Sequence, residues 1–415
     1  MKNTSEDYDF NQYLLSNGIT LVHKNIPYTK LVHCGVMIDV GSRDELEHEF
    51  GMVHLWEHMA FKGTKKRSSI SIATYLDSLG GELNAYTTKE KICFHASVLD
   101  KHFKKAVDLL SDITFNSVFP EKELKKEKGV IIEEMSMYLD SPEDSIQDDF
   151  EQLIYQDHSL AHNILGEIET FSKFSQSDLI NFVDSKLGTS NMVVSVVGNV
   201  GFQEAISIVN DYFNLFTFKA SIVQRSSFNL YQKKELILPR ALSQTHISIG
   251  GIACGQDHED RIPTFLLFNL LGGSAMNAIL NLNLREKKGM VYGIDSTYNA
   301  FTDCGCYSIY FACDKKKADK SMQIVMQTLD QMKHKLLSDR QLLSYKEQLK
   351  AQIAMSEENN MAIMLMLAKS ILDYGRVESI NQTFDLIDQI NSEKILNLSK
   401  SLFDTDNIST LIYQQ

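Results

Sequence analysis

The sequence lacks the features that would assign the chain to a membrane or to an oxidising compartment. No run of about 18 apolar residues occurs among its 415 residues, which excludes a membrane-spanning helix. The six cysteines form no C-x-x-C pair and follow no framework spacing, so we expect reduced thiols in a cytoplasmic protein. The first twenty residues contain neither arginine nor a basic start followed by an apolar core, and we therefore expect no secretory or mitochondrial leader.

An excess of positive charge is also missing. The formal net charge is −13, which disfavours nucleic acid and anionic membrane surfaces as partners. Apolar residues make up 43% of the chain and charged residues 23%, as in an ordinary soluble globular protein. The length is sufficient for two domains with sizeable cores.

Two histidines and a glutamate lie close together in the segment GMVHLWEHMAFKGT, residues 51–64. In a helix, His54 and His58 lie one turn apart on one face and can bind a single metal ion. Glu57 borders that face and can reach a metal-bound water without being a ligand. Zinc accepts such a site when a third protein ligand is present and one position stays open. The alternative is a helix whose histidines share a face by chance, and a third ligand is needed to decide.

The third ligand is expected on a second helix, which begins at Pro120 and ends before a Ser-Pro pair. Glu127, Ile131, Glu134 and Tyr138 fall on one stripe of this helix. Acidic residues on an inward stripe are costly unless they bind something. A charged helix with a solvated face would explain its lysines, but it does not explain Glu134, which has apolar neighbours on both sides.

A rival histidine pair, His158 and His162, has the same spacing. No acidic residue lies between the two, and a loop follows directly. We therefore do not expect a metal site there.

The chain resembles the peptidase family that includes pitrilysin, insulysin and the mitochondrial processing peptidase. His54-x-x-Glu57-His58 is the reverse of the commoner H-E-x-x-H and is typical of the inverzincins. A ligand glutamate follows about 76 residues later in the family, which corresponds to Glu134, and Glu127 matches its supporting acidic position. The similarity runs almost end to end, with further matches at FKGT (61–64), GGELNAYTT (80–88) and LREKKGMVY (284–292).

The resemblance implies a zinc-dependent endopeptidase with one Zn²⁺ per chain. His54, His58 and Glu134 would be the ligands. Glu57 would take a proton from the metal-bound water and later pass it to the leaving amine. Glu127 would orient a ligand histidine without contacting the metal itself.

The resemblance also implies residues that contact a peptide. Arg285 and Tyr292 match an Arg–Tyr pair that faces the zinc from a different domain; without the resemblance they would be a surface charge and a packed ring. Asn84 and Ala85 lie in the family strand that pairs with bound peptide, although the same residues could form an ordinary hairpin. Pairing through main-chain hydrogen bonds would restrict substrates to extended peptides.

Family members of this half-size length pair two chains into a clam-shell chamber, in which Arg285 and Tyr292 would complete the partner's site. Because one chain carries both motifs, we expect a homodimer, with a heterodimer of related subunits as the alternative. The family also includes inactive core subunits of respiratory complexes, so a structural subunit is the alternative function. The intact ligands and base argue against it.

The second half of the chain repeats the first. THISIGGIACG, residues 245–255, resembles residues 32–41 at an offset of 214, and residues 407–413 match 191–197 at an offset of 216. Such matches indicate α+β architecture with two homologous α/β-roll domains, each a mainly antiparallel sheet packed against helices. The predicted division is a metal-binding domain at 1–215, a linker at 216–235 and a homologous domain at 236–415. The offset puts Phe268, Leu271 and Gly272 at the positions of His54, Glu57 and His58, so the second domain is expected to lack the metal.

Overall fold

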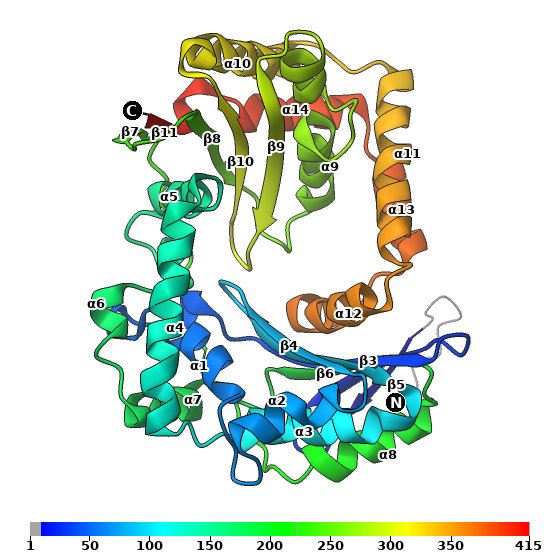
Figure 1. Ribbon diagram of the computed structural model, residues 1–415. Coiled ribbons are helices and arrows are strands. Elements are labelled where there is room, and N and C mark those ends of the chain that lie inside the picture. The colour runs from blue at the N-terminus through cyan, green and yellow to red at the C-terminus, as the bar shows by residue number, and fades with distance from the viewer. Residues whose placement is uncertain (1–9, 222, 415) are drawn as a thin grey trace. The chain divides into compact units, whose positions relative to one another are not determined.

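The structure is a computed structural model that describes residues 10–221 and 223–414 (Figure 1). It forms two compact units. The described residues of Met1–Met135, His162–Arg225 and Met355–Ser379 make up unit 1, and those of Ser136–Ala161, Ser226–Ala354 and Ile380–Gln415 make up unit 2. Residues 1–9, which bear on the leader prediction, lie outside the described residues. Residue 222 of the predicted linker does so as well.

Unit 1 contains a sheet of six strands within the described residues, in the order β1-β2-β6-β3-β5-β4. β2 and β6 are parallel, and the other neighbouring pairs are antiparallel. The strands are β1 (Asn11–Leu14), β2 (Thr20–Asn25), β3 (Leu31–Ile38), β4 (Glu82–Thr87), β5 (Ile92–Leu99) and β6 (Met192–Gly198). The helices are α1 (Met52–Ala60), α2 (Ser69–Asp77), α3 (Phe103–Phe115), α4 (Glu121–Asp140, which ends in unit 2), α6 (Ile168–Phe171), α7 (Gln176–Lys186), α8 (Phe202–Phe213) and α12 (Asn360–Tyr374).

Unit 2 repeats this plan with the order β7-β11-β8-β10-β9. β7 and β11 are parallel and the remaining pairs antiparallel, so these strands correspond in turn to β2-β6-β3-β5-β4. The strands are β7 (Glu235–Pro239), β8 (Thr245–Ala253), β9 (Val291–Ala300), β10 (Gly305–Cys313) and β11 (Ser409–Gln414). The helices are α5 (Pro142–Tyr155), α9 (Arg261–Gly272), the π-helix η4 (Asn281–Glu286), α10 (Ala318–His334), α11 (Asp339–Ser356, whose last residues belong to unit 1), α13 (Ile380–Asp388) and α14 (Ser392–Leu402). The shared order and the shared parallel pair confirm the predicted duplicated α+β fold.

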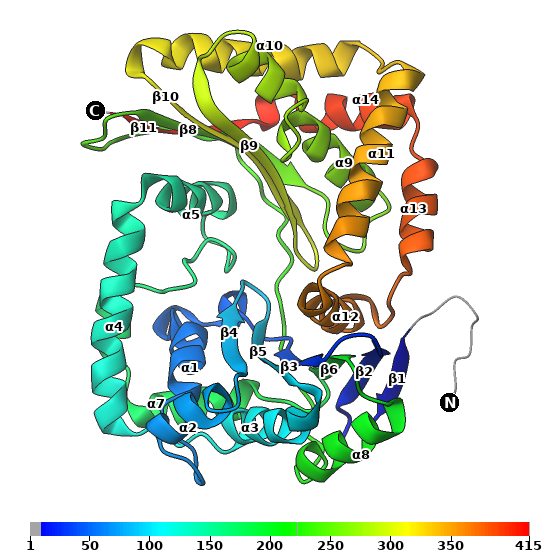
Figure 2. The same ribbon diagram turned by 45° about the vertical axis from the view of Figure 1, so that its right-hand side comes forward.

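Each sheet is covered by helices on both faces. In unit 1, α3 and α8 pack on one face, and α12 covers the other through Ile363, Met364 and Leu367 (Figure 1). In unit 2, α9, α10 and α14 share one core with the sheet (Figure 2), and α5 covers the opposite face through Ile146 and Phe150. Strands buried on both faces read as continuous apolar runs, which explains the sequence MVVSVV of β6.

The helices α5 and α12 are exchanged between the halves of the sequence. α5 comes from the first half but packs in unit 2, and α12 comes from the second half but packs in unit 1. The two helices occupy equivalent positions in the duplicated plan. The predicted division at 1–215, 216–235 and 236–415 concerns homologous halves rather than packing, and it stays a prediction.

Two further observations concern the expected environment of the chain. No helix of the described residues is both long enough and apolar enough to cross a lipid bilayer. All six cysteines are free thiols, and five of them are buried.

The helix α1 is anchored at its first turn. Gly51 precedes it with φ 93°, a left-handed conformation that glycine adopts without strain. The buried carboxyl group of Glu45 accepts hydrogen bonds from the N–H of Gly51 at 2.9 Å and of Val53 at 2.7 Å. Burial raises the pKa of Glu45 to about 8, although both hydrogen bonds act to lower it. Glu45 therefore satisfies two N–H groups that the start of a helix leaves without intrahelical partners.

We expect Glu45→Ala to lower the free energy of unfolding of unit 1 by about 1–3 kcal/mol, because it leaves buried N–H groups without acceptors. The only tryptophan of the chain, Trp56, is buried in α1, so its fluorescence during urea unfolding reports on this unit. Glu47→Ala, at an exposed position in the same segment, should stay within about 0.5 kcal/mol of the parent. Equal losses in the two variants would contradict the anchoring role.

Candidate metal centre

The helix α1 carries three of the residues singled out from the sequence. Leu55, Trp56 and Met59 bury one side of α1 in the core of unit 1. His54 and His58 lie on another side, one turn apart, with ring centroids 4.6 Å from each other. The helical spacing therefore aligns the two imidazoles as a pair.

The helix α4 brings Glu134 to the same place. Ile131 and Met135 of α4 are buried in the core of unit 1 and fix the face that Glu134 presents. The Nε2 atom of His54 lies 3.8 Å from Oε1 of Glu134, and the Nε2 atom of His58 lies 3.5 Å from Oε2. Within residues 10–221 and 223–414, no other group of three or more His, Cys, Asp or Glu side chains converges in this way.

The three donors fit a zinc ion. Their ligand atoms all lie within 4.8 Å of one another. In tetrahedral zinc sites with bonds of about 2.0–2.1 Å, donor atoms are roughly 3.3 Å apart. The separations between the Nε2 atoms of the histidines and the Glu134 carboxylate, 3.8 Å for His54 and 3.5 Å for His58, exceed this value only slightly. Two imidazoles and a carboxylate are also the donor types that zinc accepts in catalytic sites.

The imidazole of His54 is suited to ligation in its neutral form. Burial and, to a smaller extent, the charge of His58 lower the pKa of His54 to about 3. Only the neutral ring offers a lone pair to a metal. His54 is therefore ready to ligate throughout the physiological pH range.

The orientation of His58 is set by Glu127. The Nδ1 atom of His58 lies 3.2 Å from Oε2 of Glu127, and the Nζ atom of Lys62 lies 2.7 Å from Oε1. Burial would raise the pKa of Glu127, but the hydrogen bond with His58 and the ion pair with Lys62 outweigh it and lower the pKa. An ionised Glu127 accepts a hydrogen bond from His58 when the proton of the ring is on Nδ1. This tautomer leaves the lone pair of His58 on Nε2.

Glu57 is held from a different element. The hydroxyl of Thr87, at the end of β4, donates to Oε2 of Glu57 at 2.5 Å. Burial raises the pKa of Glu57, while the hydrogen bond from Thr87 and the charge of His58 oppose this and the charge of Glu134 adds to it. A carboxylate with a raised pKa beside three potential metal ligands has the properties of a general base.

Asn84 and Ala85 lie on an edge strand. β4 pairs with β5 on one side, and among the described strands none pairs with its other side. Asn84 is exposed, and its Oδ1 atom accepts a hydrogen bond from the N–H of Ala85 at 2.8 Å. Such an edge presents backbone groups to which an extended peptide can be added.

Arg285 and Tyr292 both belong to unit 2. Arg285 lies in η4 and Tyr292 near the start of β9. The guanidinium carbon of Arg285 lies 5.5 Å from the centre of the Tyr292 ring, a cation–π distance. The side chain of Tyr292 is 87% exposed, so its hydroxyl is available to another molecule.

The rival histidines have other contacts. The Nε2 atom of His158 lies 3.0 Å from the carbonyl oxygen of Ser226, and the ring of His162 stacks on Phe50 at 3.5 Å. Neither belongs to the converging group of side chains in the described part of the chain.

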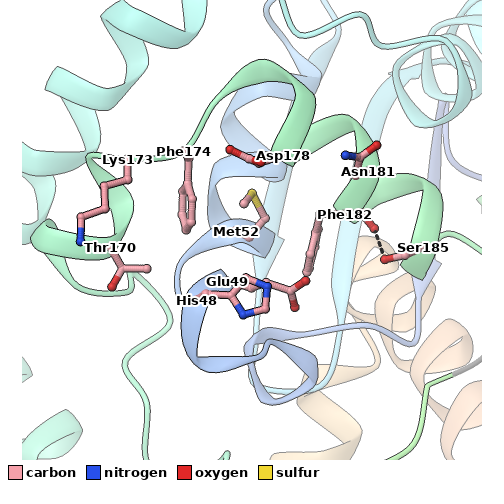
Figure 3. Close-up of a pocket in the computed structure, with 10 residues that line it drawn as sticks. All are labelled: His48, Glu49, Met52, Thr170, Lys173, Phe174, Asp178, Asn181, Phe182 and Ser185. Carbon is pink, nitrogen blue, oxygen red and sulfur yellow. Dashed lines mark hydrogen bonds between the residues drawn. The ribbon is translucent and has the colours of Figure 1, made fainter.

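Unit 1 also has a pocket of about 630 Å³, and none of the three potential metal ligands lines it (Figure 3). The buried side chains of Met52, Phe174 and Phe182 line it, together with polar side chains such as those of His48 and Lys173. None of the residues singled out from the sequence lines this pocket.

No role was assigned to Lys62 from the sequence, and Thr87 was placed only in the strand expected to pair with peptide, without a contact to Glu57. Lys62 follows the metal motif by four residues, and Thr87 ends the strand ELNAYT. Alternation along that strand places Thr87 on the same face as Leu83 and Ala85, which pack against the core beside α1. That alternation was the signal that could have found Thr87.

Comparisons with known proteins found matches along most of the chain. Residues 20–167 match the model of insulinase, peptidase family M16, and residues 173–349 match the model of the peptidase M16 inactive domain. The uncharacterized zinc protease YmxG of Bacillus subtilis is 32% identical over 401 residues, covering 97% of each chain. An uncharacterized zinc protease of Mycobacterium leprae is 30% identical over 394 residues, covering 94% of this chain and 88% of that one.

Solved structures share the fold at lower identity. A protease from Helicobacter pylori has a TM-score of 0.91 at 18% identity, covering 98% of this chain and 99% of that one. A chain of complex III from Candida albicans has a TM-score of 0.83 at 19% identity, covering 97% and 95%. Together with a 32% identical relative matched along nearly its whole length, these comparisons show that the chain belongs to the insulinase family, peptidase family M16.

Proposed function

We propose that the protein is a zinc-dependent endopeptidase that hydrolyses peptides or unfolded segments, bound as an added strand inside a clam-shell chamber. The convergence of His54, His58 and Glu134, with Glu57 beside them, carries this proposal. The names of the relatives as zinc proteases support it.

His54, His58 and Glu134 would hold one zinc ion per chain. The ion would supply Lewis-acid polarisation of a water molecule and of the peptide carbonyl in the position that these three residues leave open. Glu57 accepts a proton from the attacking water at Oε1, since Thr87 occupies Oε2. Glu57 then delivers this proton to the leaving amine nitrogen, and Glu127 keeps the His58 ring in place throughout.

The same proposal gives Asn84, Ala85, Arg285 and Tyr292 roles toward substrate. The edge of β4 at Asn84 and Ala85 would add the peptide as a strand. Tyr292 would donate a hydrogen bond to the carbonyl oxygen as negative charge develops, and Arg285 would hold a backbone carbonyl. The exposure of Tyr292 and its contact with Arg285 suit a pair that completes a site on a partner chain.

We assign the metal-binding role to residues 1–215 and the homologous, metal-free role to 236–415. A cytoplasmic location is our proposal from the six free thiols. The alternative of a non-catalytic subunit of a larger complex is in line with the fold shared with a chain of complex III. The complete set of ligands and base favours the peptidase.

Glu57→Gln should lower kcat/KM for an unfolded, internally quenched peptide by about 10²–10⁴-fold, because it removes the proton acceptor. The variant should still bind about one zinc per chain by elemental analysis. His54→Ala should lose both zinc and activity. Wild-type protein that cleaves no faster than Glu57→Gln would remove the peptidase proposal.

Glu127→Gln should weaken zinc binding by about 10–100-fold, since an amide orients the His58 ring less strongly than a carboxylate. Competition against a chromophoric chelator measures the affinity. Glu133→Gln is the matched control, an exposed glutamate on the same helix. The supporting role is wrong if the two variants bind zinc equally well.

The active protein should have a mass of about twice 47.1 kDa in solution, because both motifs of a complete site belong to one kind of chain. Light scattering coupled to gel filtration measures this mass. A fully active species of a single chain would contradict the homodimer.

A further inference from the structure

We infer that Thr87 is a positioning residue that fixes Glu57 for proton transfer and links its orientation to the strand that binds peptide. This inference rests on the proposed function and adds a residue to it. Thr87 itself does not contact the reacting atoms in this assignment.

The contact between Thr87 and Glu57 joins two elements of unit 1. Thr87 is the last residue of β4, and Glu57 lies on α1. The hydroxyl of Thr87 donates to Oε2 of Glu57 at 2.5 Å. A hydroxyl donating to a carboxylate is among the stronger hydrogen bonds in proteins. This hydrogen bond fixes Oε2 of Glu57 and with it the plane of the carboxylate. The position of the second oxygen, Oε1, is thereby restricted as well.

The donor is itself rigid. Thr87 pairs with Ile92 of β5, and the side chain of Ile92 is fully buried. Threonine is branched at Cβ, so few side-chain rotamers are open to it in a strand. The direction of the hydroxyl is therefore determined by the backbone of β4.

The same strand presents the edge for peptide addition. Thr87 follows Ala85 by two residues, a rise of about 7 Å along a strand. The backbone of β4 would thus position two groups, namely a peptide paired with its edge and the carboxylate of Glu57. A shift of about 1 Å between base and bound peptide can cost about 100-fold in rate, so this link matters for catalysis.

Three variants separate positioning from packing. Thr87→Val keeps the shape of the side chain and removes the donor, whereas Thr87→Ser keeps the donor. Thr88→Val is the control, because the Thr88 hydroxyl accepts from the N–H of Lys91 at 2.9 Å and serves the turn after β4. The three variants are compared with wild type for kcat, KM, zinc content and thermal midpoint.

Thr87→Val should lower kcat about 10–100-fold at unchanged KM and zinc content, and Thr87→Ser should keep kcat within about threefold of wild type. Thr88→Val should lower the thermal midpoint but leave kcat within about twofold of wild type. A merely structural role for Thr87 predicts the reverse, namely a lower midpoint with little change in kcat. That result, or equal kcat for the Val and Ser variants, would overturn the inference.

Crystal structures of wild type and Thr87→Val give a readout that does not depend on activity. We expect one Glu57 conformer in wild type and a rotated or multiply placed carboxylate in the variant. An unmoved Glu57 in the variant would overturn the positioning role even if the enzyme is active. An inactive wild type would instead remove the proposed function, and the Glu57 conformers would still decide whether Thr87 fixes this side chain.

Discussion

The centre depends on one constraint: two imidazole Nε2 atoms and one carboxylate must face a common point although they come from separate helices. Neither helix could meet this constraint alone. α1 is held at its start by the glycine turn and by the buried carboxyl group of Glu45. α4 is held by Ile131 and Met135, which are buried on either side of Glu134. The polar cluster therefore relies on apolar packing for its geometry, because the attraction between partly exposed charges is too weak to position helices.

The second unit shows what the same architecture becomes without this constraint. α9 has the place in its unit that α1 has in the first, and eight of its 12 residues are buried. Phe268 and Leu271 fill the core at the positions that correspond to His54 and Glu57. At Gly272, which corresponds to His58, an added Cβ atom would lie 2.7 Å from the side chain of Ser296 in β9. The helix thus lies so close to the sheet that a histidine would not fit there. A sheet and its helices can keep their order while one helix exchanges ligands for apolar side chains.

Local patterns predicted the elements well, and contacts between elements poorly. The spacing of His54 and His58 requires only a helix, and the stripe through Glu134 requires only a second one. The contact of Thr87 with Glu57 joins residues 30 apart in sequence, and no periodicity encodes it. The exchange of α5 and α12 was not predicted either, since an apolar face does not specify which of two similar sheets it will cover.

The edge strand β4 also carries the residue that contacts the proposed base, because Thr87 of β4 donates a hydrogen bond to Glu57 of α1. An exposed edge strand attracts any extended chain, and proteins commonly protect such edges against unwanted pairing. Here the strand is short, carries the charged Glu82 at its start, and ends at the contact with the base. Backbone pairing reads little side-chain sequence, so in the proposed function selection would depend on whether a substrate can become extended. In the proposed function, a strand that both admits an extended chain and holds the base would act on unfolded segments and leave folded ones intact. In this proposal, β4 would thus link the position of the base on α1 to the binding of an extended substrate.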